Sequence, residues 1–113
     1  MTTEPFPPTA TAAAFNRART IAVRATETGL PIDIRIDRSE LRYGGERLAQ
    51  EILRLCRDAG REAGARRREE LASEGMPAHV LDRLGLPTRD DVAAAERADA
   101  EDVDAPTSWM RLV

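Results

Sequence analysis

Residues 32–37 read Ile-Asp-Ile-Arg-Ile-Asp, a strict alternation of apolar and charged side chains. This period of two predicts a strand with one apolar and one polar face. Residues 20–26 show the same alternation. The apolar side of this second segment consists of Ile21, Val23 and Ala25. The connection between the two segments contains Gly29 and is too short for a parallel crossover, so the pattern predicts an antiparallel β-hairpin.

A helical period follows further along the chain. Over residues 46–73, apolar side chains recur every three or four positions, and the opposite side is rich in Arg, Asp and Glu. The apolar positions are Leu48, Ile52, Leu55, Ala59 and Ala63. Gly44 and Gly45 interrupt the chain before this segment, and Gly75 is a natural C-terminal stop. We therefore expect one long amphipathic helix that packs across the hairpin.

The remaining segments carry weaker patterns. We expect a short helix over residues 10–17, because their alanines have high helix propensity, and either a short edge strand or a loop over residues 39–43. A second short helix is expected over residues 77–84, since proline suits a first helical turn. Residues 90–102 are expected to form a third helix that faces solvent.

These elements predict one domain with two flanking segments. We expect a flexible Pro/Ala-rich lead over residues 1–14, an α+β domain over residues 15–86, and an acidic, partly helical or disordered tail over residues 87–113. A domain of about 70 residues buries only about 60% of the surface that its unfolded chain exposes. A hairpin with one helix across it is too thin to cover its own apolar side chains. We therefore expect a homodimer.

The expected fold class is α+β, an antiparallel β-hairpin or three-stranded sheet packed on one long helix, in a dimer. The apolar positions of the strand and the helix are expected to form the core and the dimer contact. They are Ile32, Ile34, Ile36, Leu48, Ile52, Leu55 and Ala59. The pairs Ala59-Gly60 and Ala63-Gly64 would let another helix or sheet approach closely, and local fraying of the helix is the alternative.

The candidate chemistry of the chain is sparse. The single cysteine, Cys56, lies on the apolar side of the helix, and His79 is the only histidine, so neither an internal disulfide nor a zinc ligand set is available. No phosphate-binding loop or nucleophile elbow is present. We expect a protein that is not an enzyme and needs no metal or cofactor. Without a signal peptide or a long apolar stretch, a cytoplasmic location away from membranes is expected.

The net charge of −3 is unevenly distributed along the chain. Residues 15–70 contain 13 Arg and 10 acidic side chains, whereas residues 71–113 contain 4 Arg and 9 acidic side chains. The candidates for contact with DNA phosphates are Arg24, Arg35, Arg66, Arg67 and Arg68. A two-fold dimer would duplicate these arginines into one extended field. For the last three, the alternative is a solvated helix end with local Glu partners.

The end of the chain is apolar although an acidic stretch precedes it. The side chains concerned are Trp109, Met110, Leu112 and Val113. We expect that they either fold back onto the domain or dock into a protein partner, and plain disorder is the third alternative. The candidate partner-binding residues among them are Trp109, Met110 and Leu112.

A resemblance to the YbaB/EbfC family rests on three parts of the chain. They are Gly29–Asp37 (Gly-Leu-Pro-Ile-Asp-Ile-Arg-Ile-Asp) with Leu41 after it, Leu48–Leu53 (Leu-Ala-Gln-Glu-Ile-Leu), and the spacing of Ala59 and Ala63. The resemblance implies a hairpin-helix fold, a small homodimer, sequence-nonspecific DNA binding and association with the nucleoid. Members of that family have a long N-terminal helix, whereas only about ten residues are available for a helix before the first expected strand here.

A narrower resemblance, to the EspD/EspH proteins, rests on Arg19–Val23, Leu48–Leu53 and Leu86–Glu96. Those are mycobacterial accessory proteins of type VII secretion, so this resemblance implies an actinobacterial, cytoplasmic interaction module with a secretion-system protein as partner. Tyr43 is followed four residues later by Arg47 rather than by an acid, so the YxxxD/E export motif is absent and a helper is expected rather than cargo. The sequence thus indicates a DNA-binding function first, with this helper role as the alternative.

Overall fold

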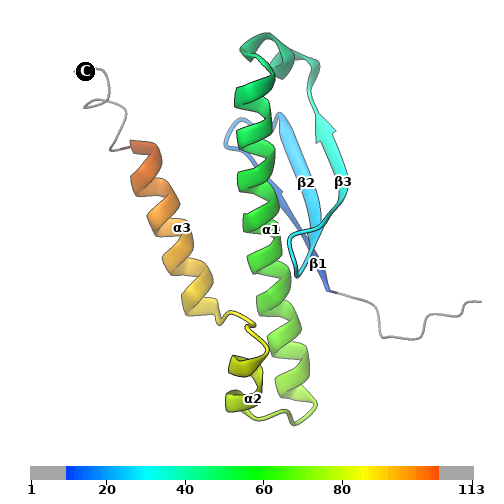
Figure 1. Cartoon of the computed structure of the whole chain (residues 1–113), viewed down its shortest axis with the longest axis vertical. Coiled ribbons are helices and arrows are strands. Elements are labelled where there is room, and N and C mark those ends of the chain that lie inside the picture. The colour runs from blue at the N-terminus through cyan, green and yellow to red at the C-terminus, as the bar shows by residue number, and fades with distance from the viewer. Residues whose placement is uncertain (1–9, 105–113) are drawn as a thin grey trace, which may run out of the picture.

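The computed structural model describes residues 10–104, of which residues 100–104 are described by their backbone alone. Its fold is α+β, as predicted, with a three-stranded antiparallel sheet in the order β1-β2-β3 packed on one long helix. The elements are β1 (Thr11–Phe15), β2 (Ile21–Thr26), β3 (Pro31–Ile36) and α1 (Gly45–Ser73). Figure 1 shows α1 between the sheet on one side and a third helix on the other, so the elements form three layers.

The hairpin of β2 and β3 follows the predicted alternation. Ile21 lies opposite Ile36 and Val23 lies opposite Ile34, so these four side chains share one face of the sheet. One irregularity interrupts the pairing close to the turn. The turn itself needs Gly29, whose φ of 83° is unfavourable for any residue with a Cβ.

β1 occupies the segment in which a short helix was expected over residues 10–17, so that prediction is wrong. Ala12 pairs with Ala25 and Ala14 pairs with Val23, which places these two of the three alanines of β1 on the face that α1 covers. Helix propensity separates residues by less than about 1 kcal/mol each, and burial in a third strand outweighs it here. Residues 11–14 of β1 overlap the stretch over residues 1–14 that was expected to be a flexible lead.

A short 3₁₀-helix, η1 (Arg38–Tyr43), stands where an edge strand or a loop was expected. Asp37 caps it, because its Oδ1 accepts a hydrogen bond from the backbone N–H of Ser39 at 2.9 Å. This bond lowers the pKa of the Asp37 carboxyl. An aspartate side chain that bonds the backbone two residues later favours a turn over a strand, which explains why β3 ends just before Asp37.

α1 matches its prediction to within one residue, and the chain turns away at Gly75, which has a φ of 102°. Between α1 and the sheet lies a small core. Its buried members are Ile21, Val23, Ala25, Leu55, Cys56 and Ala59, with Ala14, Leu48 and Ile52 packed at its margin. Three large side chains, Ile21, Val23 and Leu55, are fully buried. Each contributes about 1.5–3 kcal/mol by burial, so this core alone gives modest stability.

Two glycines of α1 allow other segments to approach the helix closely. A Cβ on Gly60 would lie 3.0 Å from the Cα of Gly29 in the β2–β3 turn. A Cβ on Gly64 would lie 2.8 Å from the Cδ of Pro87 in the linker before the third helix. The expected close approach to these small residues is confirmed, but the neighbours are a turn and a linker rather than another helix or sheet.

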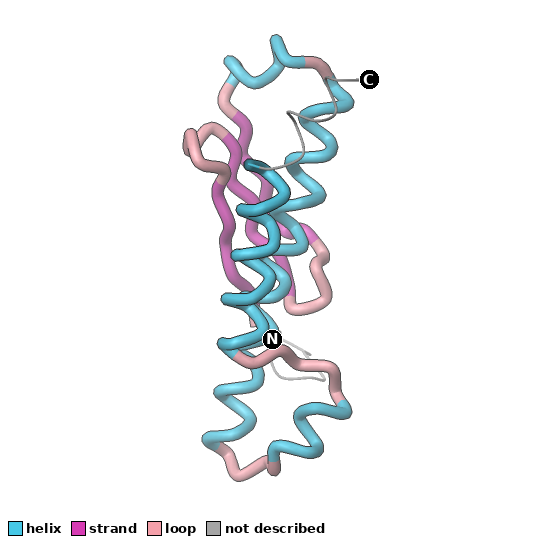
Figure 2. Tube along the Cα trace, turned by 90° about the vertical axis from the view of Figure 1, so that its left-hand side faces the viewer, coloured by secondary structure: helices cyan, strands magenta, loops and turns pink. Residues whose placement is uncertain are grey.

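Two further helices follow α1 within the described residues, α2 (Ala78–Arg83) and α3 (Arg89–Asp104). α3 was expected to face solvent, but it lies along α1 on the side away from the sheet, and Val92 is buried there (Figures 1 and 2). Its N-terminus has reciprocal hydrogen bonds between Thr88 and Asp91, both of 3.0 Å, which form a capping box. None of the described helices has both the length and the apolar character of a membrane span.

The core differs from its prediction at the isoleucines of β3. Ile32, Ile34 and Ile36 were expected to pack against α1, but all three remain exposed in this chain. α1 packs chiefly on β1 and β2, so β3 extends beyond the edge of the helix. The sequence pattern identified the apolar face of this strand correctly, and the position of the helix leaves that face uncovered.

Candidate functional site

The first candidate site is an apolar area that we call the β3 surface, defined as the side chains of Ile32, Ile34, Ile36 and Leu53. The isoleucines are 52%, 40% and 38% exposed, and Leu53 is 57% exposed. Leu53 precedes Gly60 by two helical turns, so it lies on the flank of α1 that contacts the β2–β3 turn. Exposed apolar side chains gathered in this way are typical of a binding surface.

The outer edge of β3 has no strand partner among the described residues, because β3 is last in the sheet order. The N–H of Asp37 donates to the carbonyl oxygen of Thr20 on the β2 side at 2.7 Å. Backbone groups alternate in direction along an antiparallel strand. The backbone N–H and C=O groups of Arg35 therefore point toward β2, whereas those of Ile34 and Ile36 point to the free edge. Such an edge is a template for another strand.

Two of the five arginines predicted to bind DNA, Arg24 and Arg35, lie on the sheet face that is turned away from α1. The Arg35 side chain is 82% exposed and pairs with Asp33 of its own strand at 3.3 Å. Arg24 is exposed and forms no ion pair within the described part of the chain. These two arginines are accessible to an anionic partner.

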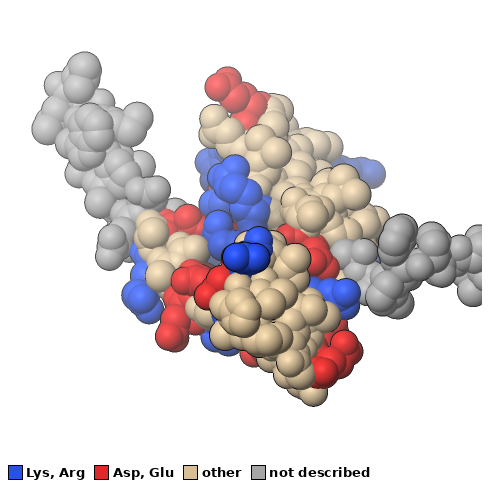
Figure 3. Space-filling model, turned by 60° about the horizontal axis from the view of Figure 1, so that its bottom comes forward, with Lys and Arg blue, Asp and Glu red and all other residues tan. Residues whose placement is uncertain are grey.

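The other three, Arg66, Arg67 and Arg68, project from α1, and each forms an ion pair with a nearby carboxylate. Their partners, in the same order, are Glu62, Glu70 and Asp82. Arg66 also donates to a backbone carbonyl of β1 at 3.2 Å, and Arg68 to a carbonyl in the α2–α3 linker at 2.8 Å. The structure does not bring them together with the arginines of the outer sheet face. Basic and acidic side chains are interspersed at the α2 end of the molecule (Figure 3).

A cavity of about 680 Å³ lies between the β1–β2 loop, η1, α1 and α3. Its walls include both guanidinium groups and carboxylates, with Phe15 and Tyr43 as aromatic members. Sequence reasoning missed this cavity, because its residues come from separate segments and none of them carries a recognisable motif. The only signal in the sequence was Asn16, which lies shortly before the second strand and can bond the backbone of the loop that leads into it.

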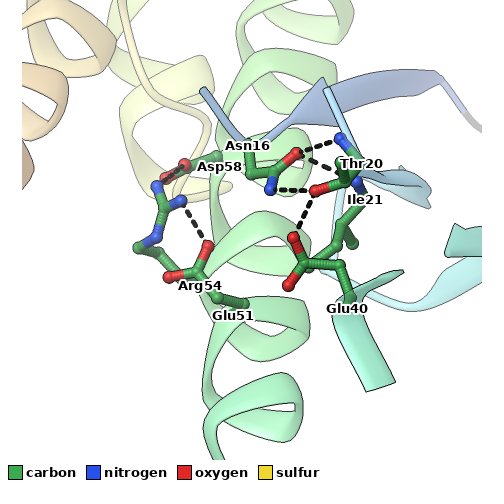
Figure 4. A network of polar contacts seen from close by, with 7 residues as sticks. All are labelled: Asn16, Thr20, Ile21, Glu40, Glu51, Arg54 and Asp58. Atoms are coloured by element: carbon green, nitrogen blue, oxygen red, sulfur yellow. Dashed lines mark hydrogen bonds and ion pairs between the residues drawn. The ribbon is translucent and has the colours of Figure 1, made fainter. Parts of the chain in front are cut away.

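Asn16 organises the loop at one side of this cavity (Figure 4). Its Oδ1 accepts hydrogen bonds from the backbone N–H groups of Thr20 at 2.8 Å and Ile21 at 2.9 Å, and its Nδ2 donates to the Thr20 hydroxyl at 2.8 Å. That hydroxyl donates to the carboxylate of Glu40 in η1. Arg19 has a φ of 62° in the same loop, a conformation unfavourable for a residue with a Cβ. The side-chain network therefore fixes a strained loop to η1.

Charged groups fill the opposite side of the cavity. Arg54 donates hydrogen bonds to Glu51 at 2.8 Å and to Asp58 at 3.3 Å (Figure 4). Arg61 donates to Asp58 at 2.5 Å and to Asp99 of α3 at 3.0 Å, so it links the two helices. Burial and the neighbouring Asp99 carboxyl raise the pKa of Asp58, although both arginines oppose this effect. These contacts explain how α3 is held against α1. The network places three carboxyl groups, those of Glu51, Asp58 and Asp99, together with two guanidinium groups.

The described residues offer few groups for catalysis. They contain no cluster of three or more His, Cys, Asp or Glu side chains placed to hold a metal ion. Cys56 is buried in the core as a free thiol, and His79 is exposed on α2. The expectation of a non-enzymatic protein therefore stays a prediction.

The residues predicted to dock into a partner, Trp109, Met110 and Leu112, lie outside the described residues, as do residues 1–9 of the expected lead. α3 ends at Asp104, before this terminal segment begins. Removal of residues 105–113 therefore leaves every described element in place, whereas removal of the whole tail from residue 87 would also remove α3.

Comparisons with known protein families, with curated proteins and with solved structures find no match to this chain. The features of the molecule that bear on its function are the β3 surface, the outer sheet face and the distribution of charge.

Proposed function

We propose that this protein is a non-enzymatic, homodimeric interaction module that binds protein partners, the helper role implied by its resemblance to the EspD/EspH proteins of type VII secretion. The β3 surface is the observation that supports the homodimer in this proposal. The apolar side chains of Ile32, Ile34, Ile36 and Leu53 are exposed beside an unpaired strand edge. That combination suits contact with another polypeptide, because apolar burial and main-chain hydrogen bonds are then both available.

The charges of the molecule favour a protein partner over DNA. Four of the five predicted DNA contacts already have carboxylate partners, namely Arg35, Arg66, Arg67 and Arg68. Binding of phosphates would have to replace those ion pairs. The acidic helix α3 also lies on α1, where its charges oppose the approach of a polyanion.

DNA binding in the manner of the YbaB/EbfC family remains a second candidate, supported by the outer face of the sheet. Arg24 and Arg35 are exposed there on neighbouring strands. A two-fold dimer would present four such arginines, which would contact phosphates without reading bases. With so few contacts, this binding would be weak and sensitive to salt.

Sedimentation equilibrium of the full chain tests the homodimer. A dimer at micromolar concentration is expected, and a compact monomer under these conditions would contradict the proposal. Fluorescence anisotropy with a labelled random-sequence duplex at low salt tests the second candidate. The unaltered chain is compared with the Arg24→Ala/Arg35→Ala variant and with Arg83→Ala, an exposed arginine of α2, as matched control.

Co-purification with individual type VII secretion proteins tests the partner class. The full chain is compared with a chain that ends at Asp104, since this truncation preserves α3. Capture of a secretion protein that is lost on truncation supports the helper role. Binding to DNA that strengthens on truncation and is lost in the Arg24→Ala/Arg35→Ala variant would instead support the nucleoid role.

A further inference from the structure

We propose that two copies of this chain pair through β3 in a single register centred on Ile34, so that their two sheets become one six-stranded antiparallel sheet. This inference rests on the proposed homodimer and specifies its contact. The pairing is suggested by the segment 32–36, Ile-Asp-Ile-Arg-Ile, in which apolar positions are symmetric about Ile34 and the two flanking charges are opposite.

The first argument is the direction of the free backbone groups. The N–H and C=O of Ile34 point away from β2, as the bond from Asp37 to Thr20 requires by alternation. In an antiparallel pair related by a two-fold axis through this position, Ile34 of each copy can exchange two hydrogen bonds with the other. A closed two-fold contact of this kind is the commonest symmetry of soluble dimers.

The second argument is charge complementarity, which distinguishes this register from its neighbours. With Ile34 opposite its own copy, Asp33 lies opposite Arg35 of the second copy, and Ile32 lies opposite its Ile36. A register centred on Asp33 would place the two copies of this carboxylate together, and one centred on Arg35 would place two guanidinium groups together. Like charges directly opposite on a sheet are destabilising.

Registers centred between two residues are disfavoured by the apolar pattern. They would set isoleucines opposite charged residues and would turn the two sheets over relative to each other, because side chains alternate between faces. In the Ile34-centred register both α1 helices lie on the same face of the joined sheet. The isoleucines and Leu53 of each copy then meet between the helices.

The position of α1 makes room for this contact. It packs chiefly on β1 and β2, so β3 of each copy is free on its edge and on its apolar face. A helix centred over β3 would have buried Ile34 and Ile36 within one chain and would have obstructed the second copy. The exposed isoleucines and the free edge thus have one common explanation, which is a second β3.

Charge exchange tests the register. In Asp33→Arg and in Arg35→Asp, each homodimer would contain two like-charge pairs across the strands, and we expect dimer affinity about tenfold lower than that of the unaltered chain. A mixture of the two variants restores opposite charges between chains while leaving like charges within each chain. Preferential heterodimer formation, measured by native mass spectrometry, is therefore expected.

A matched pair of variants controls for net charge. Glu74→Arg mixed with Arg83→Asp carries the same charge changes at the α1–α2 end, and we expect a statistical mixture of dimers. A second measurement is disulfide formation by Ile34→Cys in a Cys56→Ala background. Cross-linking at position 34 is expected to exceed that of Asp33→Cys, which would face position 35 rather than itself.

The outcomes separate the register from the proposed function. Absence of any dimer of the unaltered chain would refute both. A stable dimer with no heterodimer preference between Asp33→Arg and Arg35→Asp, or with equal cross-linking at positions 33 and 34, would refute the register and leave the homodimer intact.

Discussion

Replacing Gly60 by alanine should destabilise the protein, although the change favours helix formation. Alanine in place of glycine stabilises a helix interior by about 0.5–1 kcal/mol. At this position, however, the added Cβ would lie 3.0 Å from the Cα and 3.1 Å from the N of Gly29. Both are backbone atoms of a turn, so they cannot rotate away as a flexible side chain could.

The steric effect should exceed the gain in helix propensity. Overpacking of a close contact costs about 1–3 kcal/mol, and a rigid backbone neighbour places Gly60→Ala in the upper part of that range. The expected net loss is about 1–2 kcal/mol in the free energy of unfolding. For a domain of this size, each kcal/mol corresponds to about 4–8 °C in Tm.

Urea denaturation followed by circular dichroism measures this effect, with all variants at one protein concentration. Gly45→Ala is the matched control, because a Cβ there has no neighbour within 4 Å. We expect this control to be as stable as the unaltered chain or slightly more stable. If Gly60→Ala proves at least as stable as Gly45→Ala, the close contact between α1 and the β2–β3 turn does not limit stability, and the reasoning is wrong.

Three other changes test the loop, the last helix and the cavity. Asn16→Ala leaves two backbone N–H groups without an acceptor and should cost about 1–3 kcal/mol in urea denaturation, whereas Asn16→Asp, which keeps an acceptor oxygen, should cost less. Thr88→Ala removes the cap of α3 and should lower stability by about 1 kcal/mol, with Thr88→Ser as the control and protease protection of α3 as the second measurement. The raised pKa of Asp58 means that the folded state binds this proton more tightly than the unfolded chain. The stability that Asp58 contributes through this proton is therefore fully present below the ordinary Asp pKa, and it is lost as the pH rises through the raised pKa of the folded state. The unaltered chain should thus lose stability relative to Asp58→Asn from about pH 4 upward. A parallel pH dependence of the two proteins would contradict this.

Periodicity predicted the long helix and the β2–β3 hairpin because each of these elements has an apolar face with its own regular pattern. Leu55 and Ala59 recur at helical spacing, and Ile21 and Val23 alternate with polar residues. The hairpin turn and the helix stop were also readable, since glycine is needed where φ is positive. Local patterns therefore located most of the elements.

The missing parts depend on contacts between segments that are distant in the sequence. β1 is an alanine-rich segment whose strand conformation comes from pairing with β2, so propensity alone indicated a helix. The exposure of Ile34 could not be predicted, because a strand pattern reports an apolar face without reporting which helix covers it. Likewise, α3 was expected to face solvent. Its contacts with Arg61 and Glu62 join positions far apart in the chain, so no local pattern could indicate them. The cavity beside Asn16 was missed for the same reason.

The chain contains a single sulfhydryl group, Cys56, buried at the interface between α1 and the sheet. A thiol reagent in water can modify it only when the helix separates from the strands, because the reactive thiolate must be reached by solvent. The rate of alkylation therefore reports how often that layer opens, without any engineered probe. The native cysteine is thus an internal probe of how often α1 separates from the sheet, and the opening rate can be measured in every variant that keeps Cys56.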